Sequence, residues 1–398
     1  MLANAAIFLV AVLVSLGGAE AFLRSFPSLI SIDILARIHE DLRTPIAAKL
    51  GFATYEDRQL VTSEWRGDGG PPFYIYLEGR NYVGRADPVD FATGGVVEQR
   101  MDDAGFCNPA VGTDRSTVDV VMIGDSFTTC TLLDPKDTFT AQIEEQTGLM
   151  TYNLGVGGIG PYEELVLLRK FGLSLKPRIV VLNIYEGNDV RDILRYLNFV
   201  LHGVDRTSRK RLGGAFAVSY ALAYLKSGIE VAFKRFVKPE KINFRYSVEI
   251  EGVRTPMNVT NNDIDEVKHA RQFESGETSL DLFAEPLEAF VILAAKQNFI
   301  PVVTLMPSVY TSYIESVRFE DEAVGRDVAA FSRAQRTWLA ENAERIGYRF
   351  IDVFPTFVEQ VKSRPLAFFP ANIHFTREGH AIVAAALGPE LKKLLSEQ

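Results

Sequence analysis

Five short apolar runs, separated by helical segments, constrain the fold of this chain most strongly. They are nearly continuous in Val, Ile and Leu, which is typical of strands that are covered on both faces of a parallel sheet. The runs lie at residues 118–124, 150–156, 178–187, 299–307 and 348–354. Helical segments lie at about 137–147, from Pro161 onward, and near 285–297, 319–346 and 377–396. This alternation predicts an α/β fold, a doubly wound three-layer αβα sandwich with a mainly parallel five-stranded sheet.

Composition and charge exclude some classes of partner. Hydrophobic residues make up 47% of the chain and charged residues 23%, and the net charge is −9 at pH 7. Nucleic acid is not expected as a partner, because phosphate contacts need clustered Lys and Arg. The sequence has no CxxC pair and no His cluster at metal-ligand spacing, so neither a metal nor an organic cofactor is expected.

The N-terminus departs from the globular pattern. Residues 2–18 carry no charge, and the apolar character continues to about residue 23, close to the roughly 20 residues that a membrane helix needs. One interpretation is a transmembrane anchor over residues 1–24, with residues 2–23 in the membrane. The other is a signal peptide that is cleaved at Ala19-Glu20-Ala21. We favour the anchor, because the charged segment that opens a signal peptide is missing.

The rest of the chain divides into an extension and a main domain. Residues 25–117 are expected to hold an amphipathic juxtamembrane helix, at about 25–50, and short strands. The main domain covers residues 118–398, with an insertion at about 190–284 whose second half reads as a hairpin and a polar loop. Between residues 206 and 241 the insertion has nine Lys or Arg against two Glu. This basic segment either rests on an anionic membrane surface or is a core-packed helix with a solvated basic face.

Candidate catalytic residues follow the ends of four of the expected strands, where open α/β sheets bind their ligands. Ser126 in GDSFT follows the first strand and would supply a nucleophilic hydroxyl. His374 in FFPANIHFT follows the last strand and would act as the base. The backbone N–H groups of Ser126 and Gly158 and the amide of Asn188 would bind a developing oxyanion. Each signal alone is weak, but four of them at strand ends are hard to explain by chance.

Three neighbouring residues are expected to support this site. Asp125 most simply braces the turn or the helix N-terminus. Gly187 and Asp189 flank Asn188 in EGND, at the end of the third expected strand.

With these blocks the chain resembles the SGNH, or GDSL, hydrolases, a family with a flavodoxin-like sandwich. Ser126 matches the first block, Gly158 the second, Asn188 the third and His374 the last, with Gly157 as an alternative to Gly158. The resemblance covers about residues 118–200 and 285–396. It implies a serine esterase without a cofactor.

The chain departs from the family at the residue that orients the histidine. The family has an Asp two or three residues before the His, where this chain has Asn372 and Ala371. Three interpretations stay open. Ser126 and His374 work as a dyad oriented by Asn372 or by a carbonyl, another carboxylate such as Asp352 or Glu186 substitutes, or the site binds ligands without catalysis.

Cys107 and Cys130 flank the first strand and its turn. A disulfide between them would need an oxidising compartment, and two free buried thiols are the alternative. Membrane-tethered relatives of this kind resemble extracytoplasmic enzymes that act on envelope or exopolysaccharide esters. We therefore expect the main domain to be extracytoplasmic, periplasmic or on the cell surface, although the basic residues after the apolar segment favour the opposite orientation.

Three functions follow from these expectations. The first is a membrane-anchored serine esterase that removes O-acyl groups from an acylated carbohydrate. The second is a polysaccharide O-acyltransferase that uses the same acyl-enzyme. The third is a non-catalytic SGNH-like subunit of a membrane assembly, with a membrane protein as its partner.

Overall fold

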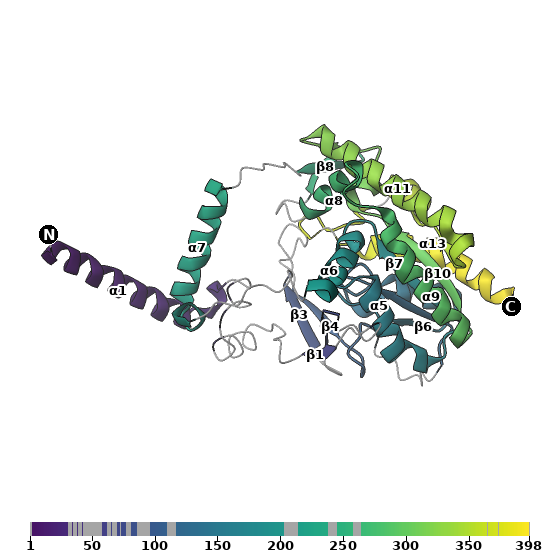
Figure 1. Ribbon diagram of the computed structural model, residues 1–398, viewed down its shortest axis with the longest axis horizontal. Coiled ribbons are helices and arrows are strands. Elements are labelled where there is room, and N and C mark those ends of the chain that lie inside the picture. The colour runs from purple at the N-terminus through teal and green to yellow at the C-terminus, as the bar shows by residue number, and fades with distance from the viewer. Residues whose placement is uncertain are drawn as a thin grey trace. The chain divides into compact units, whose positions relative to one another are not determined.

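The computed structural model describes most of the chain. The described residues are 2–30, 34, 38, 42, 58–61, 65, 70–71, 73–76, 81–85, 96–109, 117–202, 214–237, 245–257, 264–363, 365–372 and 374–397. The chain divides into two compact units (Figure 1). The helical unit comprises Met1–Arg58 and Asp205–Lys241, and the sheet unit comprises Gln59–Val204 and Ile242–Gln398.

A five-stranded parallel sheet forms the centre of the sheet unit. Its strands are β5 (Val120–Gly124), β6 (Thr151–Asn153), β7 (Ile179–Tyr185), β10 (Ile300–Met306) and β12 (Arg349–Ile351). They lie in the order β12-β10-β7-β5-β6, and every neighbouring pair is parallel. Numbered along the chain, this is the order 2-1-3-4-5 of flavodoxin-like folds. The predicted doubly wound sheet is confirmed.

Helices cover both faces of this sheet. They are α4 (Phe139–Thr147), α5 (Pro161–Leu167), α9 (Ala284–Gln297), α11 (Glu322–Ile346) and α13 (Arg377–Ser396). In one layer α4 packs against α13, and in the other α9 packs against α5 and α11. Local chemistry sets their ends: the Thr138 hydroxyl accepts a hydrogen bond from Ala141 N, and Gly148 ends α4 with a φ of 76°. All residues of β5 and β7 are buried, as their apolar runs predict.

Shorter helical turns connect the larger elements. They are η3 (Pro135–Asp137), η4 (Leu168–Gly172), η5 (Leu173–Leu175), η7 (Leu280–Phe283), α10 (Val309–Ser312) and α12 (Phe354–Gln360).

The predicted insertion is more ordered than its sequence suggests. It opens with α6 (Asp189–His202), which packs against α5. The expected hairpin is present as β8 (Tyr246–Ile250) and β9 (Val253–Met257), and β11 (Val317–Phe319) pairs with β8. The expectation of a polar loop after the hairpin is wrong, because α8 (Ile264–Glu274) lies there. Its buried Val267 and Ala270 and its packing against α11 stabilise it as a helix.

The extension before the sheet contains two strand pairs, β1 (Arg58–Val61) with β2 (Phe73–Tyr76), and β3 (Asn81–Arg85) with β4 (Val96–Arg100). Most of the amphipathic helix expected at 25–50 lies outside the described residues. Within its range, the structure describes η1 (Pro27–Leu29) and the buried residues Ile30, Ile34 and Ile38.

The helical unit contains α1 (Leu2–Ser25), η6 (Gly214–Ala217) and α7 (Tyr220–Val237). Within this unit Glu20 joins α1 to α7: its Oε2 accepts hydrogen bonds from Ser219 Oγ at 2.9 Å and Ala221 N at 3.0 Å. In the part of the chain that the structure describes, no helix is both long and apolar enough to cross a membrane, so the spanning anchor predicted at residues 1–24 is not found there.

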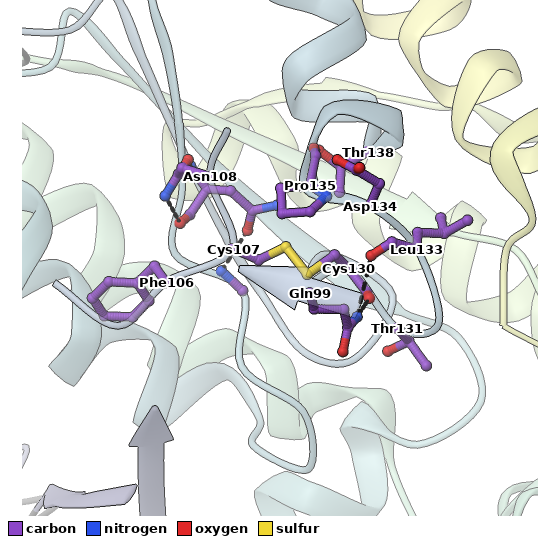
Figure 2. The surroundings of a disulfide bond; sticks show 12 residues. Gln99, Phe106, Cys107, Asn108, Cys130, Thr131, Leu133, Asp134, Pro135 and Thr138 are labelled. Carbon is purple, nitrogen blue, oxygen red and sulfur yellow. Dashed lines mark hydrogen bonds between the residues drawn. A yellow bond between two sulfur atoms is a disulfide. The ribbon is translucent and has the colours of Figure 1, made fainter. Parts of the chain in front are cut away.

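A disulfide joins the extension to the turn after β5. Cys107 and Cys130 are bonded, so the alternative of two free thiols is wrong (Figure 2). The Gln99 side chain donates to the carbonyls of Cys130 and Leu133 beside this bond. The segment before β5 is thereby held against the segment that follows the candidate nucleophile.

We expect loss of this disulfide to lower the free energy of unfolding by about 3 kcal/mol, since it closes a loop with a sequence separation of 23 residues. Urea unfolding of the Cys107→Ser/Cys130→Ser double variant measures this loss. Wild type with a reductant should approach the double variant, and the double variant should not respond to the reductant. A loss below about 1 kcal/mol would contradict a bracing role for the bond.

Candidate active site

The turn that follows β5 presents Ser126. Asp125 organises this turn: its Oδ1 accepts a hydrogen bond from Phe127 N at 2.8 Å, and its carbonyl accepts from Thr128 N at 3.1 Å. Gly124 is required there, because a Cβ would lie 2.1 Å from Thr128 Oγ1. The bracing role expected of Asp125 agrees with these contacts.

Ser126, His374 and Asn372 form a hydrogen-bonded chain. Ser126 Oγ lies 2.8 Å from His374 Nε2, although the two residues are 248 positions apart. On the other side of the ring, His374 Nδ1 lies 2.6 Å from Asn372 Oδ1 and 3.2 Å from the Asn372 carbonyl. Both of these oxygens accept only, so the ring proton belongs on Nδ1 and the lone pair on Nε2 faces the serine hydroxyl. This is the tautomer that a general base needs.

An aromatic stack holds the imidazole in place. The ring of Phe127 stacks on Tyr185, with centroids 3.7 Å apart, and on His374, with centroids 4.7 Å apart. Phe127 is buried, and Phe375 meets its ring edge at 5.0 Å. Sequence reasoning missed Phe127, because nothing in GDSFT distinguishes a ring that packs on the base from an ordinary core aromatic.

The glycine loop after β6 packs directly against the catalytic turn. Asn153, at the end of β6, donates from its side chain to Thr128 O at 2.7 Å and accepts from Gly155 N at 2.8 Å. A Cβ on Gly155 would lie 2.5 Å from Thr129 N, and one on Gly157 would lie 3.5 Å from Ser126 Cβ. Gly157, the weaker of the two sequence candidates, is thus close to the nucleophile.

Gly158 and Asn188 are the other two residues that the sequence predicts on the oxyanion side. Gly158 follows Gly157 with a φ of +79°, a conformation that favours glycine. The side chain of Asn188 hydrogen-bonds to Asp125, as does the backbone N–H of Ser126. Because an amide NH₂ has two hydrogens, Asn188 can hold Asp125 with one of them and offer the other to a ligand.

The other predicted supporting residues have structural partners. Asp189 accepts a hydrogen bond from Tyr185 N at 2.8 Å. Gly187 leaves room for Glu266, whose Oε1 would lie 2.3 Å from a Cβ at position 187.

The substitute carboxylates proposed from the sequence serve other partners. Asp352 pairs with Arg336 at 2.8 Å and accepts from Phe354 N at 3.0 Å. The buried carboxylate of Glu186 accepts hydrogen bonds from three hydroxyls, those of Ser308, Thr311 and Ser332. Among the described residues, Asn372 contacts His374 Nδ1 and these two carboxylates do not, so the assignment of Asp352 to the histidine is wrong. Arg336 compensates the charge of Asp352, and hydroxyl groups occupy the oxygens of Glu186.

Buried carboxyl groups lie around the catalytic turn, a feature that sequence reasoning did not find. The group consists of Asp125, Glu163, Glu164, Asp189 and Asp192. Burial raises the pKa of Asp125 to about 7 and that of Glu163 to about 7, and it raises the pKa of Glu164 and Asp189 well above the ordinary range. Arg195 pairs with Glu163 and with Asp192, each at 3.0 Å. Burial therefore favours the protonated form of Asp125, Glu163, Glu164 and Asp189 near neutral pH.

Burial has the opposite effect on the histidine. Loss of solvation lowers the pKa of His374 to about 4, only partly offset by the hydrogen bond to the Asn372 carbonyl. The imidazole is therefore neutral at pH 7 and ready to accept a proton. Within the described residues no group of three His, Cys, Asp or Glu side chains is arranged to hold a metal ion.

Comparisons with known proteins give weak similarities. Neither the protein-family models nor the curated proteins contain a match. Among solved structures, the chain is similar to a lipolytic protein of the G-D-S-L family from Desulfitobacterium hafniense (13% identity, TM-score 0.36, 69% of this chain and 99% of that one). It is also similar to an acetyl xylan esterase from Geobacillus stearothermophilus (14%, TM-score 0.37, 69% and 95%). These identities and TM-scores assign no family to the chain.

We expect Asn372→Asp to raise the pKa of His374 from about 4. A carboxylate in contact with the imidazole favours its protonated form, and the rise should be about one to three pH units. A histidine NMR titration of the full chain measures this value directly. The matched control Asn342→Asp, on α11, should leave it unchanged. An unchanged or lower pKa in Asn372→Asp would mean that residue 372 does not contact the ring in solution.

The buried carboxyl groups should make the protein less stable as pH rises. Their folded pKa values lie above the unfolded ones, so their contribution is present below about pH 4 and is lost as pH rises through about 7 for Asp125 and Glu163. We expect the urea midpoint to fall from pH 7 to pH 9, a range in which His374 and His380 are largely neutral in both the folded and the unfolded chain and therefore add little slope. The fall should be smaller in Glu164→Gln than in wild type, and Glu344→Gln, at an exposed position on α11, is the control. Equal slopes in all three proteins would contradict this account.

Proposed function

We propose that this protein is a serine esterase that removes O-acyl groups from carbohydrate. The observation that carries the proposal is the 2.8 Å contact between Ser126 Oγ and His374 Nε2, with the other ring nitrogen held by Asn372. A serine hydroxyl is a weak nucleophile until a base takes its proton, and this geometry supports that transfer.

The reaction would proceed through an acyl-enzyme. Ser126 Oγ attacks the ester carbonyl while its proton passes to His374 Nε2. The carbonyl oxygen becomes an oxyanion that the Gly157–Gly158 loop and Asn188 stabilise. His374 then protonates the departing sugar oxygen. In the second half, His374 takes a proton from water, the hydroxide attacks the acyl carbonyl, and Ser126 leaves with the proton as the carboxylic acid is released.

Asn372 supplies orientation without charge. In serine proteases an Asp-to-Asn change lowers turnover by about 10⁴, because the wrong tautomer of the histidine results. Here the Oδ1 and the backbone carbonyl of Asn372 both accept from Nδ1, which favours the working tautomer. The imidazolium that forms during attack lacks a carboxylate partner. We therefore expect turnover to be slower than in a complete triad, but not abolished.

The carbohydrate substrate and the location are the least constrained parts of the proposal. The resemblance to enzymes of envelope and exopolysaccharide esters supports an acylated glycan. The Cys107–Cys130 disulfide supports an oxidising, extracytoplasmic compartment, since such bonds rarely persist in the cytosol.

A fluorophosphonate probe tests the central claim, because it reacts only with an activated serine. We expect it to label the wild-type protein and not Ser126→Ala. Hydrolysis of acetyl esters should fall by about 10³-fold or more in that variant. Ser174→Ala, at an exposed serine, should keep both activities. If folded wild-type protein is not labelled, the site binds without catalysis, and both enzyme functions are wrong.

The acyltransferase alternative shares the acyl-enzyme and differs only in the acceptor. Product analysis with an acetyl donor, with and without a glycan, separates the two. Free acetate in both cases supports the esterase. Acetate that appears on the glycan in preference to water would replace the esterase with the transferase.

A further inference from the structure

The helical unit exposes several large apolar side chains to solvent. In α1 the side chains of Ile7, Phe8, Leu13 and Val14 are 60 to 71% exposed. Within the same unit, Phe216, Val218, Leu225 and Ile229 are exposed on and beside α7. Scattered exposed apolar residues are ordinary, but an apolar helix of this length is normally covered.

Hydrogen bonds join the C-terminal end of α1 to the start of α7 within the helical unit. Glu20 accepts hydrogen bonds from Ser219 Oγ and Ala221 N at the start of α7, and it pairs with Arg24 at 2.8 Å. Tyr224 adds a hydrogen bond to Leu29 O at 3.1 Å. The two helices that expose apolar side chains therefore belong to one unit and meet at this junction.

The basic charge of the helical unit indicates what kind of partner covers its exposed apolar side chains. The helical unit has 14 Lys and Arg against nine Asp and Glu, whereas the rest of the chain has 28 against 42. Nine of those 14 basic residues lie in the segment 206–241 that contains α7. Lys226 shares α7 with the exposed Leu225 and Ile229, and its Nζ lies 5.2 Å from the ring of Phe216. Basic residues beside apolar ones are the pattern of helices that lie in the interface of an anionic bilayer.

We propose that the helical unit is a membrane-surface module, in which α7, together with α1, lies in the interface of an anionic lipid bilayer. Leu225 and Ile229, four residues apart on one helix face, enter the boundary between headgroups and acyl chains. Lys226 contacts the lipid phosphates, and the basic composition of the segment 206–241 adds to this attraction. This inference is independent of the esterase proposal, because it uses no residue of the sheet unit.

A dye that reports polarity tests the position of α7 in the full chain. We attach it at Ile229→Cys and, as a matched control, at Ile292→Cys on α9, since the two positions are 60% and 56% exposed. With vesicles that contain phosphatidylglycerol, emission at 229 should shift to the blue and become protected from an aqueous quencher. Emission at 292 should not change. Hydrolysis of a small water-soluble ester should not change in either protein.

A second pair of variants tests the charge. Lys226→Gln should weaken binding to phosphatidylglycerol vesicles by about fivefold, and Lys296→Gln on α9 should not, because a basic residue near an anionic surface contributes about 1 kcal/mol. Two results would overturn the proposal. In one, the protein floats with vesicles while the dye at 229 stays quenchable. In the other, the dye shifts with protein concentration in the absence of lipid, which would mean that a second copy of the chain covers this surface.

Discussion

The tight turn after β5 is the constraint on which the rest of the site depends. It places Ser126 at the carboxyl edge of the sheet, and it persists because Asp125 binds the backbone amides inside it. Glycines at positions 124 and 155 let the turn and the loop after β6 approach closely enough to touch. The disulfide at Cys130 then fixes the outgoing chain. These contacts surround the serine that lies 2.8 Å from the imidazole.

Burial shapes the electrostatics of the site in two opposite ways. It favours the neutral form of His374 by lowering its pKa, and it favours the protonated form of Asp125 and Glu164 by raising theirs. Both effects remove charge from the interior, where it would be costly. The site therefore relies on hydrogen-bond geometry and ring stacking, from Asn372 and Phe127, where a complete triad would use a carboxylate. Asn372 orients the imidazole of His374, but it supplies no negative charge to stabilise the imidazolium.

The two units differ in charge and in exposed apolar surface. The sheet unit is acidic and holds the candidate catalytic residues, while the helical unit is basic and carries exposed apolar helices. The segment 205–241 is far from residues 1–58 in sequence but belongs to the same unit, joined through Glu20 and α7. Part of the predicted insertion thus belongs to the helical unit and not to the sheet unit.

The sheet, its helices and the residues at the strand ends could be predicted from the sequence, because apolar periodicity and strand-end motifs are local signals. The residue that orients His374 could not be predicted from the sequence, because Asn372, Asp352 and Glu186 were all candidates. In the structure Asn372 contacts the imidazole, whereas Asp352 pairs with Arg336 and Glu186 binds hydroxyl groups. The tertiary structure also decided the role of Phe127 and the protonation of the buried acids, because stacking and desolvation depend on neighbours that are remote in the chain. For the same reason α8 folds as a helix where its polar sequence suggested a loop: the burial of Val267 against distant elements outweighs a weak local preference.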